Sequence, residues 1–213
     1  MKKAIIVGAT GLIGAQVLEL LLKENSYEKV IAITRKPIGI TDDKLYNLVI
    51  NFSNLRDHVD QIKGDDVFCC LGTTIKQAGS KEAFRKVDLE YPLSLAGISK
   101  AQGATQFLLI TALGADKNSS IFYNKVKGEV EEKIDKVGFN SFQIFQPSML
   151  LGERKDERSA ESIGQSVMKM LNFAIPLKYK AIESSKVARA MIKIALQNQT
   201  GKRIHTSGEI QSL

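Results

Sequence analysis

The sequence predicts an α/β fold in which helices cover both faces of a doubly wound parallel sheet. Its apolar runs are short and nearly continuous, which is typical of strands buried on both faces. Longer segments with helical spacing lie between most of these runs, and this alternation favours parallel strands joined by right-handed crossovers. Gly103 and Gly138 each follow a helical run and precede an apolar one, as expected where helices end.

The predicted elements follow in order along a chain of 213 residues, a length that fits one α/β domain. Strands are predicted at residues 4–7, 30–34, 48–52, 67–71, 107–111 and 142–145. Helices are predicted at residues 12–23, 81–101, 122–137 and 186–196. We interpret residues 1–213 as a single domain in which residues 147–213 contribute a small substrate or lid region. The polar stretch 152–162 is the predicted lid, and the predicted core or pocket wall includes Val167, Met170 and Leu171.

Composition and charge narrow the class of protein. The net charge of +7 comes from cations that are spread along the chain rather than grouped in a stripe, so nucleic-acid binding is not favoured. No apolar run approaches the roughly 18 residues of a membrane span, and the run at residues 4–7 ends at Gly8, too early for a signal peptide. These patterns predict a cytoplasmic protein. Cys69 and Cys70 alternate within one apolar run as small buried side chains do, and no metal site is predicted.

A glycine-rich turn follows the first predicted strand directly. Its spacing, Gly8-x-x-Gly11-x-x-Gly14, differs by one residue from the dinucleotide fingerprint. Gly8 permits a sharp turn, Gly11 lets the backbone approach a pyrophosphate, and Gly14 lets the next helix pack closely on the sheet. Because backbone amides and the positive helix end face the phosphates, the turn predicts a Rossmann-type dinucleotide site rather than a merely structural turn. The predicted cofactor contacts in this turn are Gly8, Thr10, Gly11, Leu12 and Ile13.

Two basic residues, Arg35 and Lys36, follow the second predicted strand, about 20 residues beyond the last glycine. NAD-binding proteins of this type carry an acidic residue there to bind the ribose hydroxyls, and none is present. Arg35 and Lys36 can instead bind a 2′-phosphate, so NADPH is favoured over NADH as the cofactor. The alternative is two solvated bases at the end of a strand.

Further cofactor contacts are predicted where the third and fourth strands end, because ligands of this fold lie beyond the carboxyl ends of the strands. Leu71, Gly72 and Thr73 are expected near the pyrophosphate and the adenosine ribose. Phe52 is placed to flank the adenine. Ordinary turn chemistry explains each of these residues equally well.

Tyr123 and Lys127 stand four residues apart on the predicted helix 122–137 and share one line along its flank. A tyrosine hydroxyl ordinarily has a pKa of about 10, so it needs a nearby cation to act as a proton donor near neutrality. Lys127 can supply that charge and also reach the nicotinamide ribose. The alternative is a tyrosine packed at a helix edge beside a solvated lysine, since Tyr-x-x-x-Lys also arises by chance.

Several segments together resemble one known family. They are Gly8-Ala9-Thr10-Gly11, Arg35-Lys36, Phe68-Cys69-Cys70-Leu71-Gly72-Thr73-Thr74, Gly114-Ala115-Asp116-Lys117, Val126-Lys127-Gly128-Glu129-Val130-Glu131 and Met149-Leu150-Leu151. The chain resembles the atypical short-chain dehydrogenase/reductases, and within them the Tat-interacting-protein family of NADPH-binding oxidoreductases. The resemblance covers nearly the whole chain and implies a Rossmann fold, bound NADPH, and Tyr123 with Lys127 as catalytic residues.

The resemblance also implies roles for five other residues. Thr111, at the end of the fifth strand, takes the place of the hydroxyl residue that hydrogen-bonds the substrate oxygen. Pro147 is an expected cofactor contact, and Ser148 and Met149, which follow it, are expected along the nicotinamide. Asp88 faces the cofactor side of the pocket by the same resemblance, although an aspartate at a helix start is explained equally well as a cap.

The chain departs from the family pattern at Ala112 and Leu113, where a serine and a lysine are expected, and at Gln146, which replaces an arginine. These departures leave the contacts to a substrate open. The leading hypothesis is an NADPH-dependent oxidoreductase that transfers hydride to a small carbonyl-type substrate. The alternative is a catalytically silent protein that binds NADPH as a redox sensor or interaction module. The two long helices 81–101 and 122–137 offer faces for a homodimer.

Overall fold

The computed structural model describes residues 1–152 and 176–213. Its central element is a seven-stranded sheet in the order β3-β2-β1-β4-β5-β6-β9, and every neighbouring pair is parallel. The strands are β1 (Lys2–Val7), β2 (Tyr27–Thr34), β3 (Leu45–Val49), β4 (Asp66–Cys69), β5 (Gln106–Ile110), β6 (Ser141–Gln146) and β9 (Gly201–Thr206). The predicted doubly wound parallel sheet is confirmed, and the strand order reverses between β1 and β4.

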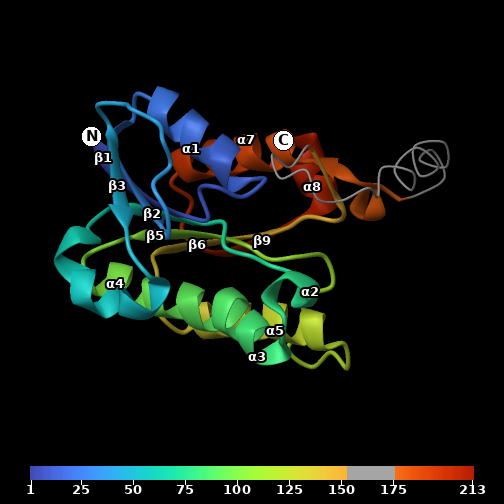
Figure 1. Ribbon diagram of the computed structural model, residues 1–213. Helices are drawn as coiled ribbons and strands as arrows, with labels where there is room; N and C mark the ends of the chain where they lie inside the picture. The colour runs from blue at the N-terminus through green and yellow to red at the C-terminus, as the bar shows by residue number, and fades with distance from the viewer. Residues whose placement is uncertain (153–175) are drawn as a thin grey trace.

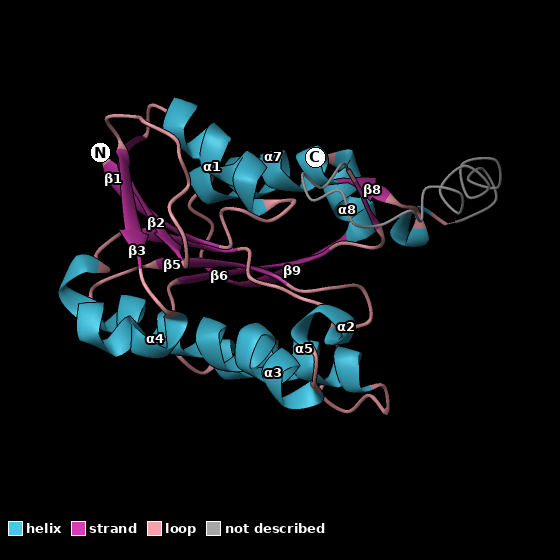
Figure 2. Ribbon diagram, viewed as in Figure 1, coloured by secondary structure: helices cyan, strands magenta, loops and turns pink. Residues whose placement is uncertain are grey.

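Helices form a layer on each face of the sheet (Figure 1, Figure 2). One layer contains α1 (Gly14–Lys23), α7 (Ser184–Leu196) and α8 (Ser207–Ser212). The other contains η1 (Phe52–Gln61), α4 (Tyr91–Ala101) and α5 (Phe122–Asp135). Three short segments lead into α4, namely α2 (Ile75–Ala78), α3 (Lys81–Arg85) and η2 (Lys86–Glu90). Between β6 and α7 lie β7 (Leu150–Leu151), η3 (Leu177–Tyr179) and β8 (Ile182–Glu183).

Alternation along each strand builds a core on both faces of the sheet. In β1, Ile5 and Val7 pack in the layer of η1, α4 and α5, whereas Ala4 and Ile6 pack in the layer of α1 and α7. All four side chains are fully buried. Because successive side chains point to opposite faces and both faces are covered, apolar residues are favoured at most positions of the strand. This double burial explains why the strands are continuous apolar runs in the sequence.

All six predicted strands are present, but the prediction at residues 48–52 is misplaced. That strand is β3, Leu45–Val49, and Phe52 begins η1 instead. The reason is a local cap, because the Asn51 side chain accepts a hydrogen bond from the Ser53 amide at 3.1 Å. The predicted helix 81–101 consists of α3, the π-helical turn η2 and α4 in succession.

The edge strand β9 and the small β7–β8 pair are absent from the prediction. In β9, residues 201–204 are exposed, so the strand lacks the continuous apolar run by which a strand is predicted from sequence. Apart from Gly152, the predicted lid lies outside the described residues, and so do Val167, Met170 and Leu171. Among the described helices, none has the length and hydropathy needed to cross a membrane.

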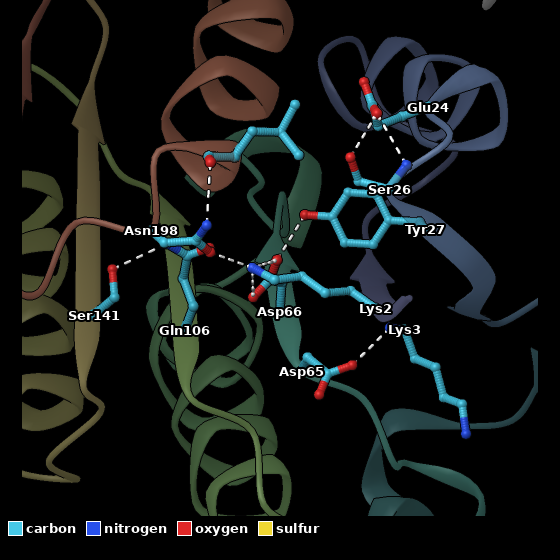
Figure 3. A network of polar contacts seen from close by, with 11 residues as sticks. Lys2, Lys3, Glu24, Ser26, Tyr27, Asp65, Asp66, Gln106, Ser141 and Asn198 are labelled. Carbon is cyan, nitrogen blue, oxygen red and sulfur yellow. Dashed lines mark hydrogen bonds and ion pairs between the residues drawn. The ribbon is translucent and has the colours of Figure 1, made fainter.

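A buried polar network joins the amino ends of the central strands (Figure 3). Asp66, at the start of β4, has no exposed surface and accepts hydrogen bonds from Tyr27 Oη at 2.7 Å and Lys2 Nζ at 3.0 Å. Lys2 Nζ also donates to Asn198 Oδ1 at 2.5 Å. Burial raises the pKa of Asp66, although the bonds from Tyr27 and Lys2 oppose this rise. The network joins β1, β2 and β4 to the segment that follows α7.

Candidate active site at the carboxyl end of the sheet

The glycine-rich turn leaves β1 at its carboxyl end and leads into α1. Gly8 has a φ of +77°, and a Cβ at this position would lie 2.4 Å from the Cys70 carbonyl oxygen. A Cβ on Gly14 would lie 2.1 Å from the Gly8 carbonyl oxygen. Neighbouring backbone therefore excludes a side chain at both positions. Gly8 makes the turn possible, and Gly14 lets α1 start directly against it.

The middle of this turn is open. A Cβ on Gly11 would come no closer than 3.3 Å to the described atoms, and Thr10 and Gly11 are both exposed. Ile13 is buried in the core of the α1 and α7 layer, and Leu12 is half-buried. The turn thus presents Thr10 and Gly11 to solvent on a backbone that the apolar residues anchor.

Arg35 and Lys36 follow β2 directly, and both are exposed. Within residues 1–152 and 176–213, neither side chain forms an ion pair or a hydrogen bond. Their charges are therefore not neutralised by the described protein. Two such cations on one turn create a positive potential at this end of the sheet.

A buried ion pair lies beneath the turn that follows β4. Lys127 Nζ is 2.6 Å from Asp88 Oδ1, and the two side chains are 5% and 0% exposed. The Thr73 amide donates to Asp88 Oδ2 at 3.0 Å. A Cβ on Gly72 would lie 3.7 Å from both Lys127 Nζ and Asp88 Oδ1. Asp88 therefore links the Gly72–Thr73 turn to α5.

Asp88 forms an ion pair with Lys127 and does not act as a helix cap. Burial raises the pKa of Asp88, against the opposing effects of Lys127 and the Thr73 amide. Burial, the largest single effect, would lower the pKa of Lys127, but the charge of Asp88, the charge of Tyr123 and the hydrogen bond to Asp88 together raise it above its usual value. Lys127 thus remains a cation. Asp88 lies within η2 rather than at a helix start, and the wider π-helical turn is a feature often found at functional sites.

Tyr123 lies one turn before Lys127 on α5. Lys127 Nζ is 5.8 Å from the centroid of the Tyr123 ring. The ring packs against Phe84, with 5.5 Å between the two centroids, and Tyr123 is half-buried. The structure therefore places Lys127 close both to the Tyr123 ring and to the Gly72 turn.

The loop between β5 and α5 is held against the helix at Gly128. A Cβ on Gly128 would lie 2.1 Å from the Lys117 amide nitrogen and 2.3 Å from the Asp116 carbonyl carbon. The Asp116 amide also donates to the Asn124 carbonyl at 3.1 Å. Because only hydrogen fits between the helix and this loop, the glycine after Lys127 lets the loop pack directly against α5.

Thr111 is buried, and its hydroxyl donates to Glu131 Oε1 at 2.5 Å. Gln146 Nε2 donates to both Glu131 oxygens, at 3.0 and 3.1 Å. Burial raises the pKa of Glu131, although the bonds from Thr111 and Gln146 oppose this. Glu131 lies two helical turns beyond Tyr123, roughly 12 Å along the axis. The Thr111 hydroxyl is thus directed to Glu131 rather than to Tyr123.

Sequence reasoning missed this use of Glu131 and of Gln146. One signal was present, because Tyr123, Lys127 and Glu131 recur at four-residue intervals on one flank of α5. Gln146, which replaces the arginine of the family pattern, has a partner within the protein. Its amide faces the buried Glu131 carboxylate.

The remaining predicted contacts differ in exposure. Phe52 is 6% exposed and its ring stacks on Tyr91, with 5.4 Å between centroids, so the structure places it in the core. Pro147 is buried, and its carbonyl accepts a hydrogen bond from the Leu113 amide at 2.9 Å. Met149 is 51% exposed. Of these three residues, Met149 has the most side-chain surface to offer to a ligand.

Comparison with known proteins decides the family. A family model described as NAD(P)H-binding matches residues 8–198. Protein HTATIP2 of Rattus norvegicus is 34% identical over 205 residues, which cover 94% of this chain and 84% of that protein. The chain belongs to the NAD(P)H-binding family. Protein FMP52 of Debaryomyces hansenii is a further relative, 32% identical over 203 residues, which cover 92% of this chain and 89% of that protein. The predicted membership of the atypical short-chain dehydrogenase/reductases is confirmed.

Solved structures share the fold of this NAD(P)H-binding protein. WbmH of Bordetella bronchiseptica, in complex with NAD+, has a TM-score of 0.73 at 16% identity, covering 100% of this chain and 78% of that one. A short chain dehydrogenase family protein from Francisella tularensis has a TM-score of 0.71 at 15% identity, covering 99% of each chain. At such low identities the likeness supports the fold alone.

The predicted cytoplasmic location is contradicted. The FMP52 relatives from Scheffersomyces stipitis, Debaryomyces hansenii and Eremothecium gossypii are named as mitochondrial proteins. The prediction depended on the lack of a membrane span and of a signal-peptide pattern. Those features bear on membrane insertion and secretion, and they do not distinguish one compartment inside the cell from another.

Proposed function

We propose that this NAD(P)H-binding protein is an NADPH-dependent oxidoreductase that transfers hydride to a small carbonyl substrate. The observation that carries the proposal is the alignment of Tyr123 with Lys127, whose ammonium is paired with the buried Asp88 beneath the Gly72 turn. This group lies at the carboxyl end of the sheet, close to where the strand order reverses. Ligands of doubly wound sheets bind in that region.

The backbone around β1 and β4 fits a dinucleotide. Thr10 and Gly11 are exposed on a turn whose other two glycines are required by close backbone contacts. Such a turn lets phosphates approach backbone amides near a helix start. When bound, NADPH supplies the hydride. The residues proposed to hold it are Gly8, Thr10, Gly11, Leu12, Ile13, Arg35, Lys36, Leu71, Gly72, Thr73, Tyr123, Lys127, Pro147 and Met149.

The preference for NADPH over NADH rests on Arg35 and Lys36. Both are exposed cations without a described partner, at the end of the strand that follows the glycine-rich turn. One charge-assisted hydrogen bond to a 2′-phosphate contributes about 1.5–3 kcal/mol. That energy corresponds to a preference of about tenfold to a hundredfold.

The protein's own residues supply the proton chemistry. Tyr123 Oη donates its proton to the substrate oxygen, so the Oη–H bond breaks as a new O–H bond forms on the former carbonyl. The Lys127 ammonium stabilises the negative charge left on the tyrosine oxygen. Asp88 holds Lys127 in place and, by raising its pKa, keeps it charged. Thr111 acts at a distance in this proposal, because its hydroxyl positions Glu131 and the end of β5.

A specific observation favours the second candidate function, an NADPH-binding sensor or interaction module without turnover. The Thr111 hydroxyl is bonded to Glu131, and the next two residues, Ala112 and Leu113, carry no polar side-chain group. A substrate oxygen would then depend on Tyr123 for its hydrogen bond. The two functions predict different behaviour of the bound cofactor.

The test measures NADPH oxidation by wild type and by Tyr123→Phe across a panel of small aldehydes and ketones. We expect Tyr123→Phe to lower the rate by about 10²–10⁴-fold, because the proton donor is lost. The matched control is Tyr46→Phe, an exposed tyrosine of β3 whose hydroxyl donates to Gln61 at 2.8 Å, and it should leave the rate unchanged. Equal rates for wild type and Tyr123→Phe would remove Tyr123 as the donor. If wild type binds NADPH but none of the carbonyl compounds causes NADPH oxidation, the second function is supported.

A further inference from the structure

The side-chain amide of Asn47 holds the turn that contains Arg35 and Lys36, the two cations without a partner among the described residues. Asn47 lies on β3 opposite Ala32 of β2. Its Nδ2 donates to the Ala32 carbonyl at 2.9 Å and to Thr34 Oγ1 at 2.8 Å. Its Oδ1 accepts a hydrogen bond from the Ile38 amide at 3.0 Å. The same side chain therefore fixes the chain both before and after the segment 35–37.

Thr34 extends this arrangement into the turn itself. Its side chain is buried, and its hydroxyl donates to the Lys36 carbonyl at 2.8 Å. The Thr34 carbonyl also accepts a hydrogen bond from the Ile50 amide at 2.8 Å, which holds it to the segment after β3. A continuous path of hydrogen bonds thus runs from Asn47 through Thr34 to the backbone of Lys36.

The cations themselves stand outside this network. Arg35 and Lys36 are exposed, and their side chains have no hydrogen-bond or ion-pair partner among the described residues. Their backbone is held, while their charged groups remain free to bind an anion. A binding group on a fixed backbone loses less conformational freedom when its ligand arrives, and so it binds more tightly.

We propose that Asn47 is a positioning residue that sets the preference for the phosphorylated cofactor. It holds the turn so that Arg35 and Lys36 meet a 2′-phosphate together. The inference rests on the proposed function, because it requires these cations to bind the 2′-phosphate of NADPH. Neither Asn47 nor Thr34 touches the cofactor in this proposal, and both act through the turn.

The test compares the binding of NADPH and NADH to the full chain by isothermal titration calorimetry. Asn47→Leu keeps the approximate size of the side chain and removes its hydrogen bonds. We expect it to weaken NADPH binding by about five- to tenfold and NADH binding by less than about twofold. Tyr46→Phe, which removes a hydroxyl from the adjacent position of β3, should leave both affinities unchanged.

Thr34 provides a second variant in case Asn47→Leu fails to fold. Thr34→Val keeps the shape of the side chain and removes the bond to Lys36, so it should reduce NADPH affinity selectively. Thr34→Ser retains the hydroxyl and should restore the preference. A merely structural role would weaken NADPH and NADH equally, and that result, or no change in either affinity, would overturn the inference.

The variant Arg35→Ala distinguishes a failure of the proposed 2′-phosphate contact from a failure of the proposed role of Asn47. We expect it to abolish most of the preference for NADPH. If Arg35→Ala does so while Asn47→Leu and Thr34→Val retain the preference, the 2′-phosphate contact stands and the role of Asn47 is wrong. If Arg35→Ala leaves the preference intact, the 2′-phosphate contact itself is wrong and the inference fails with it.

Discussion

The two ends of the parallel sheet each contain a buried aspartate, but their surroundings differ. At the amino end, Asp66 is bonded to Tyr27 and Lys2, and Lys2 is bonded in turn to Asn198 (Figure 3). At the carboxyl end, Asp88 holds Lys127 beneath a turn whose surface is open. Asp66 binds groups that belong to the protein's own hydrogen-bond network. Asp88 instead holds Lys127 and the Thr73 amide next to the solvent-exposed Gly72.

We interpret the Asp66 network as a structural use of buried charge and the Asp88–Lys127 pair as support for the proposed cofactor site. The amino-end network joins strands to one another, and the groups around Asp66 are used by the protein itself. The carboxyl end instead combines exposed backbone at Thr10 and Gly11 with the unpaired cations Arg35 and Lys36. Polar groups that find no partner within a protein point to a ligand when they converge on one region.

The largest expected effect comes from breaking the ion pair at the carboxyl end. Lys127→Met leaves the Asp88 carboxylate buried without its cation, so the free energy of unfolding should fall by about 3–5 kcal/mol. Adding Asp88→Asn removes the uncompensated charge and should recover at least about 1 kcal/mol of that loss. Urea unfolding of wild type, both single variants and the double variant measures the coupling. If the double variant is as unstable as the sum of the two singles, the pair does not act as described.

A smaller effect tests the packing of the glycine-rich turn. Gly14→Ala places a Cβ against the Gly8 carbonyl, and it should lower the free energy of unfolding by about 1–3 kcal/mol. Gly97→Ala is the matched control, because a Cβ on this glycine of α4 would meet no neighbouring side chain or segment within 4 Å among the described residues. It should raise stability by about 0.5–1 kcal/mol through helix propensity. Thermal unfolding of the two variants side by side would contradict this account if both moved in the same direction.

The smallest effect concerns the amino end and its pH dependence. Burial raises the pKa of Asp66, so the folded state binds a proton more readily than the unfolded state. The stability that results is complete below the unfolded pKa of about 3.9 and is lost as pH rises through the folded pKa. Asp66→Asn cannot ionise, so its free energy of unfolding relative to wild type should increase as pH rises from about 4. Urea unfolding over a pH series checks this, and a difference that stays constant or decreases would show that the network compensates the charge fully.

Much of the fold follows from local pattern. The strands at residues 4–7 and 107–111 could be predicted because strands buried on both faces consist mainly of apolar residues. The glycine-rich turn could be predicted because backbone contacts exclude side chains from Gly8 and Gly14. In contrast, β9 is held at the sheet edge by its pairing with β6, and its exposed residues carry no local signal.

The site was predictable only where one helix carries the pattern. Tyr123 and Lys127 are linked by the helical period, which the sequence displays. The partner of Lys127 is not, because Asp88 reaches it through a π-helical turn on a different segment. Asn47 was missed for a similar reason, since its contacts depend on the register of β3 against β2.

The proposed function requires the carboxyl end of the sheet to bind the nicotinamide cofactor with its reactive ring beside Tyr123. A crystal structure of the protein with NADP+ would show where the cofactor binds. We expect the pyrophosphate over Gly11, the 2′-phosphate at Arg35, and the nicotinamide ribose next to Lys127. A cofactor bound instead in the cavity of about 390 Å³ that Lys186 and Arg189 of α7 line with α8 would show that this site is wrong.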